Sequence, residues 1–336
     1  MDIRLFTCSF GAGHMRAADY IASMAPAHRV ERIDITRFLF PLLADGMYHM
    51  YTRMMRTQGM GYRAYLAGDR HKKKDALTAK LLIHRFARHM DAMATPDAFV
   101  ATFSTAAWLL AEYKKRRGLS IPLIVCITDF EPHDFWVNEG TDLYLVASSY
   151  TERELQKFGV PKEKIVVVGL SPRRAAAHLT YERAHRVLVT GGGLGLLPRE
   201  LGFYRTITAL YGEDVRVVTG RNKALYKKLR RARIPGITVL GFVDMERELD
   251  RADIVIGKAG GLSTYEAIMA ETPIVYIDPF LPQEKKNARF IDSEKIGTSF
   301  GEIVDRDTIL AQREEMRRIK AEADPAEFQE YLEAFA

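Results

Sequence analysis

Cysteine is scarce in this sequence, which contains only Cys8 and Cys126 among its 336 residues. Each lies at the end of an apolar segment typical of a β-strand, and we expect both to be buried free thiols in a reducing cytosol. A fold that depends on disulfides is therefore excluded. Cysteine and histidine residues nowhere have the spacing of a metal site, so the sequence predicts no bound metal.

Long apolar runs are also missing. No segment approaches the roughly 18 consecutive apolar residues that cross a bilayer. The chain enters a predicted strand within its first few residues, and we expect no signal peptide. Hydrophobic residues make up 47% and charged residues 27% of the sequence, which is typical of a globular protein and excludes a disordered one. A chain of this length is sufficient for two domains.

A large excess of one charge is absent overall, because the net charge is +6. Residues 1–172 carry 23 basic and 18 acidic side chains, whereas the remainder carries 26 and 25. Between Met47 and Met90, ten Lys and Arg residues accompany only two Asp, among several Met and Tyr. Such a segment is compatible with an anionic membrane surface, with nucleic acid, or with the solvated face of a helix. Aromatic stacking platforms and known nucleic-acid motifs are missing, so we expect no nucleic-acid partner.

The first glycine-rich turn follows the apolar segment Ile3–Phe6. Gly11 and Gly13 permit close backbone approach, and His14 then stands at the start of a helix predicted from about Met15. The positive end of a helix disfavours imidazolium. His14 is therefore a candidate for a neutral ring that accepts a proton.

A second group of polar residues follows the apolar segment Leu123–Thr128. In a parallel α/β sheet, loops at the carboxyl ends of strands build the site. Asp129, His133 and Trp136 are therefore candidate site residues, although Trp136 could instead pack in the core.

The stretch 253–287 has the pattern of a phosphate-binding turn. The apolar segment 254–256 predicts a buried strand, and Gly260 and Gly261 allow a tight turn into a helix. Free N–H groups and a partial positive charge at such a helix end suit a phosphate. Glu266 lies one turn inside this helix, where a carboxylate can accept hydrogen bonds from a ribose diol. An ordinary βαβ unit with glycines used for packing gives the same pattern.

Two further features complete this second half. Ser263 and Thr264 are typical N-cap residues, and we expect them to cap the helix. Another glycine turn, 190–195, follows an apolar segment at the equivalent place, the start of a second α/β domain.

Together these segments resemble the GT-B glycosyltransferases of the monogalactosyldiacylglycerol synthase and processive diacylglycerol glucosyltransferase family, and more distantly the lipid II N-acetylglucosaminyltransferase. The resemblance covers nearly the whole chain, through motifs in the same order: SFGAGH, TPDAFVATFS, TDFEPHDFW, DLYLVASSYTERELQKFGVPKEKIVVVGL, GGGLG, TGRN, GFVDM and KAGGLSTYEA. Two positions depart from the family pattern. Pro282 replaces the glycine before Gln-Glu, so the identity of the sugar is left open. Gly169-Leu170-Ser171 replaces the Gly-Ile-Pro of the interdomain hinge.

The resemblance implies roles for individual residues. His14 is the base that deprotonates the acceptor hydroxyl, and Asp129, His133 and Trp136 are acceptor-side candidates. The donor-binding residues that it implies are Gly13, Arg173, Gly193, Arg221, Phe242, Val243, Gly260, Gly261, Leu262, Ser263, Thr264, Glu266, Gln283, Glu284 and Asn287.

The implied fold is α/β and of the GT-B class, with two Rossmann-like domains facing across a cleft. We expect an N-terminal acceptor domain at 1–172, a C-terminal UDP-sugar domain at 173–312, and a terminal helix at 313–336 that packs back on the first domain. The implied activity is inverting transfer of a hexose from a UDP-sugar to diacylglycerol or a monoglycosyldiacylglycerol, without a cofactor or a required metal. The enzyme would be cytoplasmic and peripheral on the inner face of the cell membrane, held there by anionic lipid. A transferase for another hydrophobic acceptor, or a UDP-sugar 2-epimerase of the same fold, remains an alternative.

Overall fold

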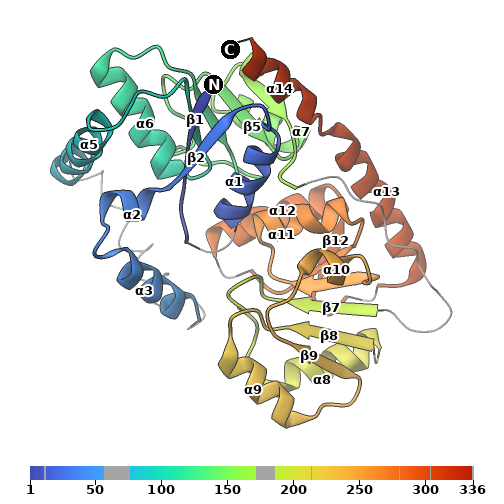
Figure 1. Cartoon of the computed structure of the whole chain (residues 1–336). Helices are drawn as coiled ribbons and strands as arrows, with labels where there is room; N and C mark the ends of the chain where they lie inside the picture. Colours follow the sequence, from blue (N-terminus) through green and yellow to red (C-terminus); the bar gives the residue numbers. More distant parts are fainter. Residues whose placement is uncertain are drawn as a thin grey trace. The chain divides into compact units, whose positions relative to one another are not determined.

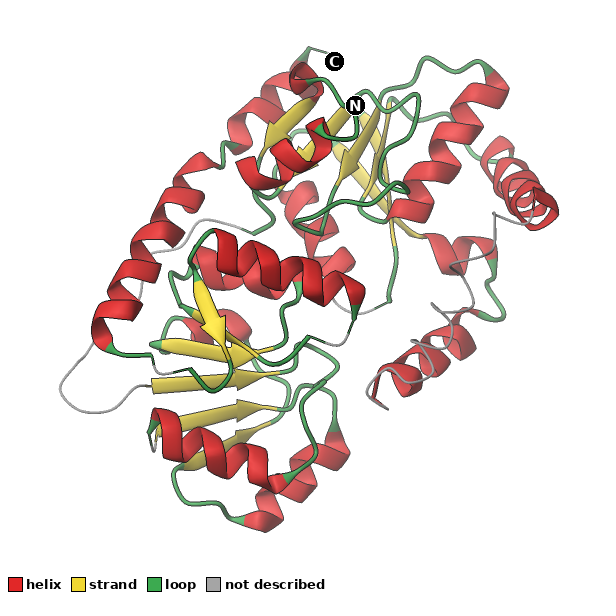
Figure 2. Ribbon diagram, turned by 180° about the vertical axis from the view of Figure 1, so that it is seen from behind, coloured by secondary structure: helices red, strands yellow, loops and turns green. Residues whose placement is uncertain are grey.

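The computed structural model of the chain divides it into two compact units (Figure 1). The first contains Met1–Leu170 and Ala323–Ala336, and the second contains Ser171–Glu322. Within them the structure describes residues 1–10, 13–56, 76–171, 186–212, 214–279, 281–302 and 304–334. Each unit has a parallel β-sheet with helices packed against it (Figure 2). The two predicted Rossmann-like α/β domains are thus confirmed.

The sheet of the first unit has the order β2-β1-β3-β4-β5-β6 over the described residues. Its strands are β1 (Asp2–Thr7), β2 (Arg29–Asp34), β3 (Ala98–Ala101), β4 (Leu123–Cys126), β5 (Leu143–Val146) and β6 (Ile165–Val167). Strands β3, β4 and β5 are buried at every position, which explains their continuous apolar sequences. Because β2 and β3 lie on opposite sides of β1, the strand order reverses between β1 and β3.

The helices of the first unit surround a core rich in aromatic rings. They are α1 (Gly13–Ser23), α2 (Ile35–Leu39), α3 (Ala44–Arg56), α5 (Ala76–Asp91), α6 (Ser104–Arg117), α7 (Ser149–Gln156), the short η1 (Lys162–Lys164) and α14 (Pro325–Glu333). Phe6 of β1, Phe38 of α2 and Phe86 of α5 meet edge to face, with centroids 5.7–5.8 Å apart. Cys8 and Cys126 are buried free thiols, as expected.

The second unit has the strand order β12-β11-β10-β7-β8-β9 over its described residues. The strands are β7 (Arg186–Thr190), β8 (Asp214–Val218), β9 (Ile237–Leu240), β10 (Ile254–Gly257), β11 (Ile274–Tyr276) and β12 (Gly297–Ser299). The helices are α8 (Leu201–Tyr211), α9 (Lys223–Ala232), α10 (Met245–Leu249), α11 (Gly261–Met269), α12 (Pro282–Ser293) and α13 (Arg306–Glu322). This is the strand order of dinucleotide-binding Rossmann folds, and it reverses between β7 and β10.

The C-terminal segment differs from the single helix expected at 313–336. Helix α13 ends at Glu322, and a second helix, α14, begins at Pro325. The Asp324 carboxylate caps α14 by accepting from the Ala326 N–H at 2.9 Å, and proline in the first turn cannot continue a preceding helix. The two units separate at 170/171 and 322/323. The sequence had placed these boundaries at 172 and 312.

Helix α14 is the part of this segment that packs in the first unit. The Asp324 N–H donates to the Val167 carbonyl at 2.8 Å, and Gln329 Nε2 donates to the Met24 carbonyl at 3.1 Å. Across the described residues, no helix has both the length and the apolar composition that a membrane span requires.

Candidate active site

His14 lies at the switch point of the first unit, beside the carboxyl ends of the neighbouring strands β1 and β3. Its Nδ1 atom is 2.8 Å from the carbonyl oxygen of Thr102, the residue that follows β3. The Thr102 hydroxyl in turn donates to Thr7 Oγ1 at 2.9 Å, at the end of β1. Crevices beside such reversals are where parallel α/β sheets bind ligands. The predicted base thus occupies the expected edge of the sheet.

The hydrogen bond to Thr102 determines which ring nitrogen of His14 can act as a base. A carbonyl oxygen can only accept, so Nδ1 carries the proton and Nε2 keeps its lone pair in the neutral ring. Burial lowers the pKa of His14 below its ordinary 6.5, while the negative charge of Asp129 and the Thr102 bond oppose that shift. The ring is therefore neutral near pH 7 and can accept a proton through Nε2.

This pKa shift predicts the acid limb of the pH–rate profile. Below its pKa His14 is protonated and cannot act as a base, so turnover should fall only at pH values below 6.5. Because Asp129 raises the pKa of His14, Asp129→Asn should move the limb to still lower pH. We would measure kcat/KM against pH for both proteins, with circular dichroism to exclude acid unfolding. A limb above 6.5, or an upward move in the variant, would contradict the assignment.

The other acceptor-side candidates follow β4 but differ in exposure. Thr128 Oγ1 lies 3.2 Å from His14 Nδ1, which brings this loop to the same edge as His14. Asp129 and His133 are partly exposed. Trp136 is 1% exposed and belongs to the core of the unit. Of the two interpretations given for Trp136, a site residue or a core residue, the structure shows packing in the core.

Sequence reasoning missed an aromatic cluster beside His14. The ring of Phe10 has its centroid 5.0 Å from that of Tyr48 and 5.1 Å from that of Tyr51, both in α3. Phe103 contacts Phe10 at 6.4 Å and His14 at 5.1 Å between centroids. The only available signal was the aromatic content of the segment after Met47, which does not reveal the partner of each ring. The cluster joins the predicted membrane segment to the residue predicted to be the base.

In the second unit, the turn after β10 forms the start of α11. The helix begins at Gly261 with Gly260 as its N-cap, and no side chain caps it. Ser263 and Thr264 were predicted caps, and this was wrong, because the Thr264 N–H already donates to the Gly260 carbonyl at 2.9 Å as the first helical bond. The N–H groups of the first turn, which includes Leu262, therefore remain available for an anion.

Glu266 lies in the second turn of this helix and is partly exposed. The five residue steps from Gly261 to Glu266 span about 8 Å of helix axis. A phosphate at the helix end and a ribose at Glu266 therefore fit the same nucleotide.

The loops after β7 and β8 interlock beside this turn. The Arg221 N–H donates to the Gly193 carbonyl at 3.0 Å, and Asn222 Nδ2 donates to the Gly195 carbonyl at 3.0 Å. Gly195 has φ +63°, and a Cβ there would lie 1.9 Å from the Thr219 carbonyl oxygen, so only glycine fits. The structure thus brings two predicted donor residues, Gly193 and Arg221, into contact.

Arg221 also reaches the loop after β9. Its guanidinium carbon lies 5.2 Å from the centroid of the Phe242 ring, a cation–π distance. Phe242 is 67% exposed and Val243 is partly exposed, so both are accessible to a base. Predicted donor residues therefore follow β7, β8, β9 and β10 at one edge of the sheet.

Helix α12, after β11, carries the last predicted donor residues. Pro282 occupies its first turn, where the missing N–H costs little, which explains how proline fits where the family that the sequence resembles has glycine. Gln283 is partly exposed, but Glu284 is 3% exposed and accepts from the Leu281 N–H at 3.4 Å. Asn287 Nδ2 donates to the Ala259 carbonyl at 3.1 Å, which holds the glycine turn in place.

Lys258 is a site residue that sequence reasoning missed. It follows β10 directly, and its Nζ lies 3.2 Å from Glu284 Oε1. This ion pair holds the ammonium two residues before the α11 N-cap, within reach of an anion bound at that helix end. The sequence feature that could have identified Lys258 is its place in the glycine turn after β10.

Some predictions lie outside the described residues. They include Arg173 and Gly11, although Gly13 itself begins α1. Within the described ranges, no group of three or more His, Cys, Asp or Glu side chains could hold a metal ion.

Comparisons with known proteins bear on the family and the fold of this chain. Residues 14–171 match the family model described as monogalactosyldiacylglycerol (MGDG) synthase. The chain is 25% identical over 313 residues to a processive diacylglycerol beta-glucosyltransferase of Bacillus cytotoxicus, covering 87% of this chain and 80% of that one. It is 24% identical over 343 residues to the protein of the same description from Bacillus subtilis, covering 95% and 89%.

Among solved structures, MurG of Acinetobacter baumannii superposes with a TM-score of 0.60 at 17% identity, covering 99% of this chain and 98% of that one. The calicheamicin glycosyltransferase CalG4 superposes with a TM-score of 0.61 at 15% identity, with the same coverage. These likenesses confirm the predicted GT-B fold.

Proposed function

We propose that the chain is a GT-B glycosyltransferase of the MGDG synthase and processive diacylglycerol glucosyltransferase family, and that it transfers a hexose from a UDP-sugar to a lipid hydroxyl. Diacylglycerol or a monoglycosyldiacylglycerol is the proposed acceptor, since relatives that span most of the chain carry that description. The observation that carries the proposal is His14, whose Nδ1–H is held by Thr102 and whose Nε2 is left to accept a proton.

The proposed reaction is a single inverting displacement. The acceptor hydroxyl loses its proton to His14 Nε2 and its oxygen forms a bond to the anomeric carbon. The bond from that carbon to the diphosphate oxygen breaks, and UDP leaves with the electron pair. The uncapped N-terminus of α11 and the Lys258 ammonium would stabilise the charge that develops on the leaving group. His14 then returns its proton to solvent.

A lipid acceptor requires the enzyme to reach a bilayer, and apolar side chains exposed on the first unit support this. Leu42 and Leu43, before α3, are 95% and 64% exposed, and Met50 of α3 is 67% exposed. Leu77 and Leu81, one turn apart on α5, are likewise exposed. We propose that they and nearby basic residues bind an anionic membrane surface, as a peripheral contact. Lys72, Lys73 and Lys74, part of the predicted basic segment, lie outside the described residues.

Replacing Leu42 and Leu43 together by serine should weaken vesicle binding at least tenfold. A fully buried leucine side chain contributes about 1.5–3 kcal/mol. The loss of two leucines that are even partly inserted should therefore weaken binding by more than tenfold. The fold should be unaffected because both side chains are exposed. Co-sedimentation with anionic vesicles measures the effect, and Leu210→Ser with Leu310→Ser on the second unit is the matched control. Equal loss in both double variants would refute a specific membrane contact.

A donor and acceptor screen tests the proposed function. The protein would be incubated with UDP-glucose, UDP-galactose or UDP-N-acetylglucosamine, each with and without diacylglycerol, and lipid products separated by thin-layer chromatography. We expect a glycolipid with one of these donors. Conversion of the UDP-sugar without lipid would instead indicate the epimerase, and product only with another apolar alcohol would change the acceptor.

A further inference from the structure

Helix α9 of the second unit carries a positive charge that is not neutralised within the described residues. The segment 223–233 contains no acidic residue, and its six basic residues are all exposed: Lys223, Lys227, Lys228, Arg230, Arg231 and Arg233. The opposite face is buried through Leu225 and Leu229, each 2% exposed. None of the six cations forms an ion pair in the part of the chain that the structure describes.

The basic cluster at the end of α6, in the first unit, is instead paired with carboxylates. At the end of α6, Lys114 lies 2.6 Å from Asp142, and Arg117 lies 2.6 Å from Asp91. Lys115, between them, pairs with a glutamate at 2.9 Å.

In α9, by contrast, like charges at i and i+4 repel within the helix, for example Lys223 with Lys227 and Lys227 with Arg231. A helix that keeps such repulsion and lacks counter-charges has the character of a binding surface.

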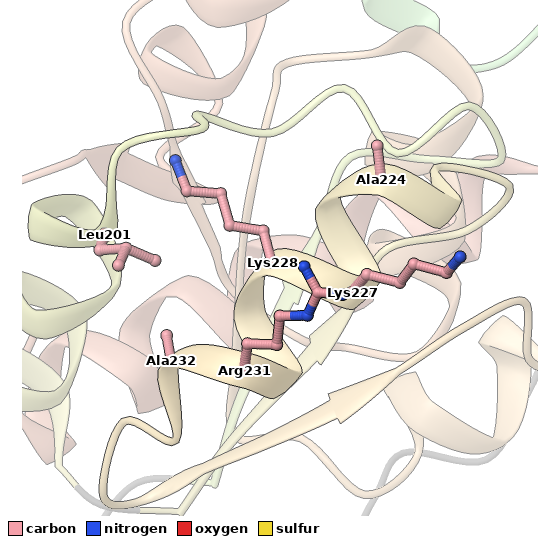
Figure 3. Close-up of a pocket in the computed structure, with 6 residues that line it drawn as sticks. All are labelled: Leu201, Ala224, Lys227, Lys228, Arg231 and Ala232. Atoms are coloured by element: carbon pink, nitrogen blue, oxygen red, sulfur yellow. The ribbon is translucent and has the colours of Figure 1, made fainter.

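A shallow hollow adjoins this helix. Its volume is about 500 Å³, and its lining consists of Leu201, Ala224, Lys227, Lys228, Arg231 and Ala232. Figure 3 shows Lys228 extending toward the side where Leu201 lies, while Lys227 leaves α9 on the other side. The floor is apolar and the rim is cationic, an arrangement in which lysine stems cover apolar surface and their ammonium groups stay in water.

The hollow extends along α9 away from the predicted donor residues. Asn222 caps α9 at the carboxyl edge of the sheet by accepting from the Leu225 N–H at 3.2 Å. From there the helix rises about 15 Å to Ala232, and no predicted donor residue lines the hollow. The charge of α9 is therefore not explained by binding of the UDP-sugar.

We propose that α9 and its hollow form a docking surface of the second unit for the phosphate groups of anionic phospholipids. An anionic bilayer offers many phosphates in one plane, which matches six exposed cations along α9 and its C-cap. Its glycerol and acyl groups match the apolar floor. No aromatic side chain lines the hollow, so it lacks the stacking platforms typical of single-stranded nucleic-acid sites. The proposal rests on the proposed function in one respect, that the acceptor lies in a membrane.

The test is a triple charge reversal, Lys227→Glu, Lys228→Glu and Arg231→Glu. Co-sedimentation would use phosphatidylcholine vesicles with and without phosphatidylglycerol, at low and high salt. We expect affinity for the anionic vesicles to fall at least about tenfold at low salt, and affinity for pure phosphatidylcholine to stay unchanged. Lys115→Glu, Lys157→Glu and Lys162→Glu on the first unit form the control, since they change the net charge equally at cations that are already paired. Affinity reduced as strongly in the control would overturn the proposal.

Two further readouts separate this inference from the proposed function. Transfer to a short-chain acceptor dispersed in detergent should be the same in the triple variant and the parent, because the donor turns are untouched. If the parent glycosylates no lipid but the variant still loses anionic vesicle binding, the docking surface stands and the proposed function fails. If the parent glycosylates lipid and the variant binds vesicles equally well, the docking surface is refuted. Tighter binding of the parent to a single-stranded oligonucleotide than to anionic vesicles would also overturn it.

Discussion

Replacing His14 by alanine is expected to lower the rate of sugar transfer by about 10²–10⁴-fold, the usual contribution of a general base. UDP affinity should stay within a few-fold of the parent, because His14 belongs to the first unit and the phosphate-type turn at Gly260 belongs to the second. Single-turnover kinetics would measure the chemical step, and calorimetric titration the affinity for UDP. Substantial transfer by a folded variant would show that another group, or water, removes the proton.

The structure explains why a second variant is needed to interpret the first. The ring of His14 packs against Phe103 and is held by Thr102, so its removal leaves a gap beside the carboxyl ends of β1 and β3. His14→Asn keeps a polar side chain of similar reach but supplies no base near neutral pH. If packing alone were responsible, asparagine should recover much of the lost activity. If the proton transfer is responsible, both variants should be equally slow. His89→Ala on α5 controls for the loss of a partly exposed histidine outside the candidate site.

Most strands could be predicted from the sequence because burial on both faces demands continuous apolar residues. The predicted segments Ile3–Phe6 and Leu123–Thr128 coincide with β1 and β4 within two residues at each end. The glycine turns were predictable for a related reason, since a chain that leaves a buried strand must reverse in little space. In a parallel sheet, the polar residues of these turns lie at one edge. This can be predicted without knowing the contacts between them.

The contacts that orient the site residues could not be read from the sequence. The Thr102 carbonyl that fixes His14 is 88 residues away, and it reaches the ring only because β3 pairs with β1. The pairing of Lys258 with Glu284 likewise depends on how α12 packs beside the turn after β10. The wrong cap prediction has a local cause, because Gly260 adopts the cap conformation without a side-chain bond. Sequence patterns favour Ser and Thr as caps, but an anion site is better served by an uncapped end.

The Glu266→Ala substitution should weaken UDP binding roughly ten- to hundred-fold. The predicted partners of this carboxylate are the two hydroxyls of the ribose, and we expect the loss of these charged hydrogen bonds to cost about 1.5–3 kcal/mol in total. The distance along α11 from its uncapped end to Glu266 suits a nucleotide whose phosphates bind at Gly261. The residue is only partly buried, so the variant should fold, which thermal unfolding would verify.

A substrate analogue locates the lost interaction more sharply than the mutation alone. If Glu266 accepts from the ribose diol, the parent should bind UDP more tightly than 2′-deoxy-UDP, because the analogue removes one donor. The Glu266→Ala variant should no longer distinguish the two ligands, since the acceptor is gone. The four affinities form a double-mutant cycle whose coupling energy reports this contact. Glu266→Gln, which keeps an acceptor oxygen but loses the charge, should give intermediate affinities. A folded alanine variant that binds UDP as tightly as the parent, or that still prefers UDP over its deoxy analogue by the same factor, would place the ribose elsewhere.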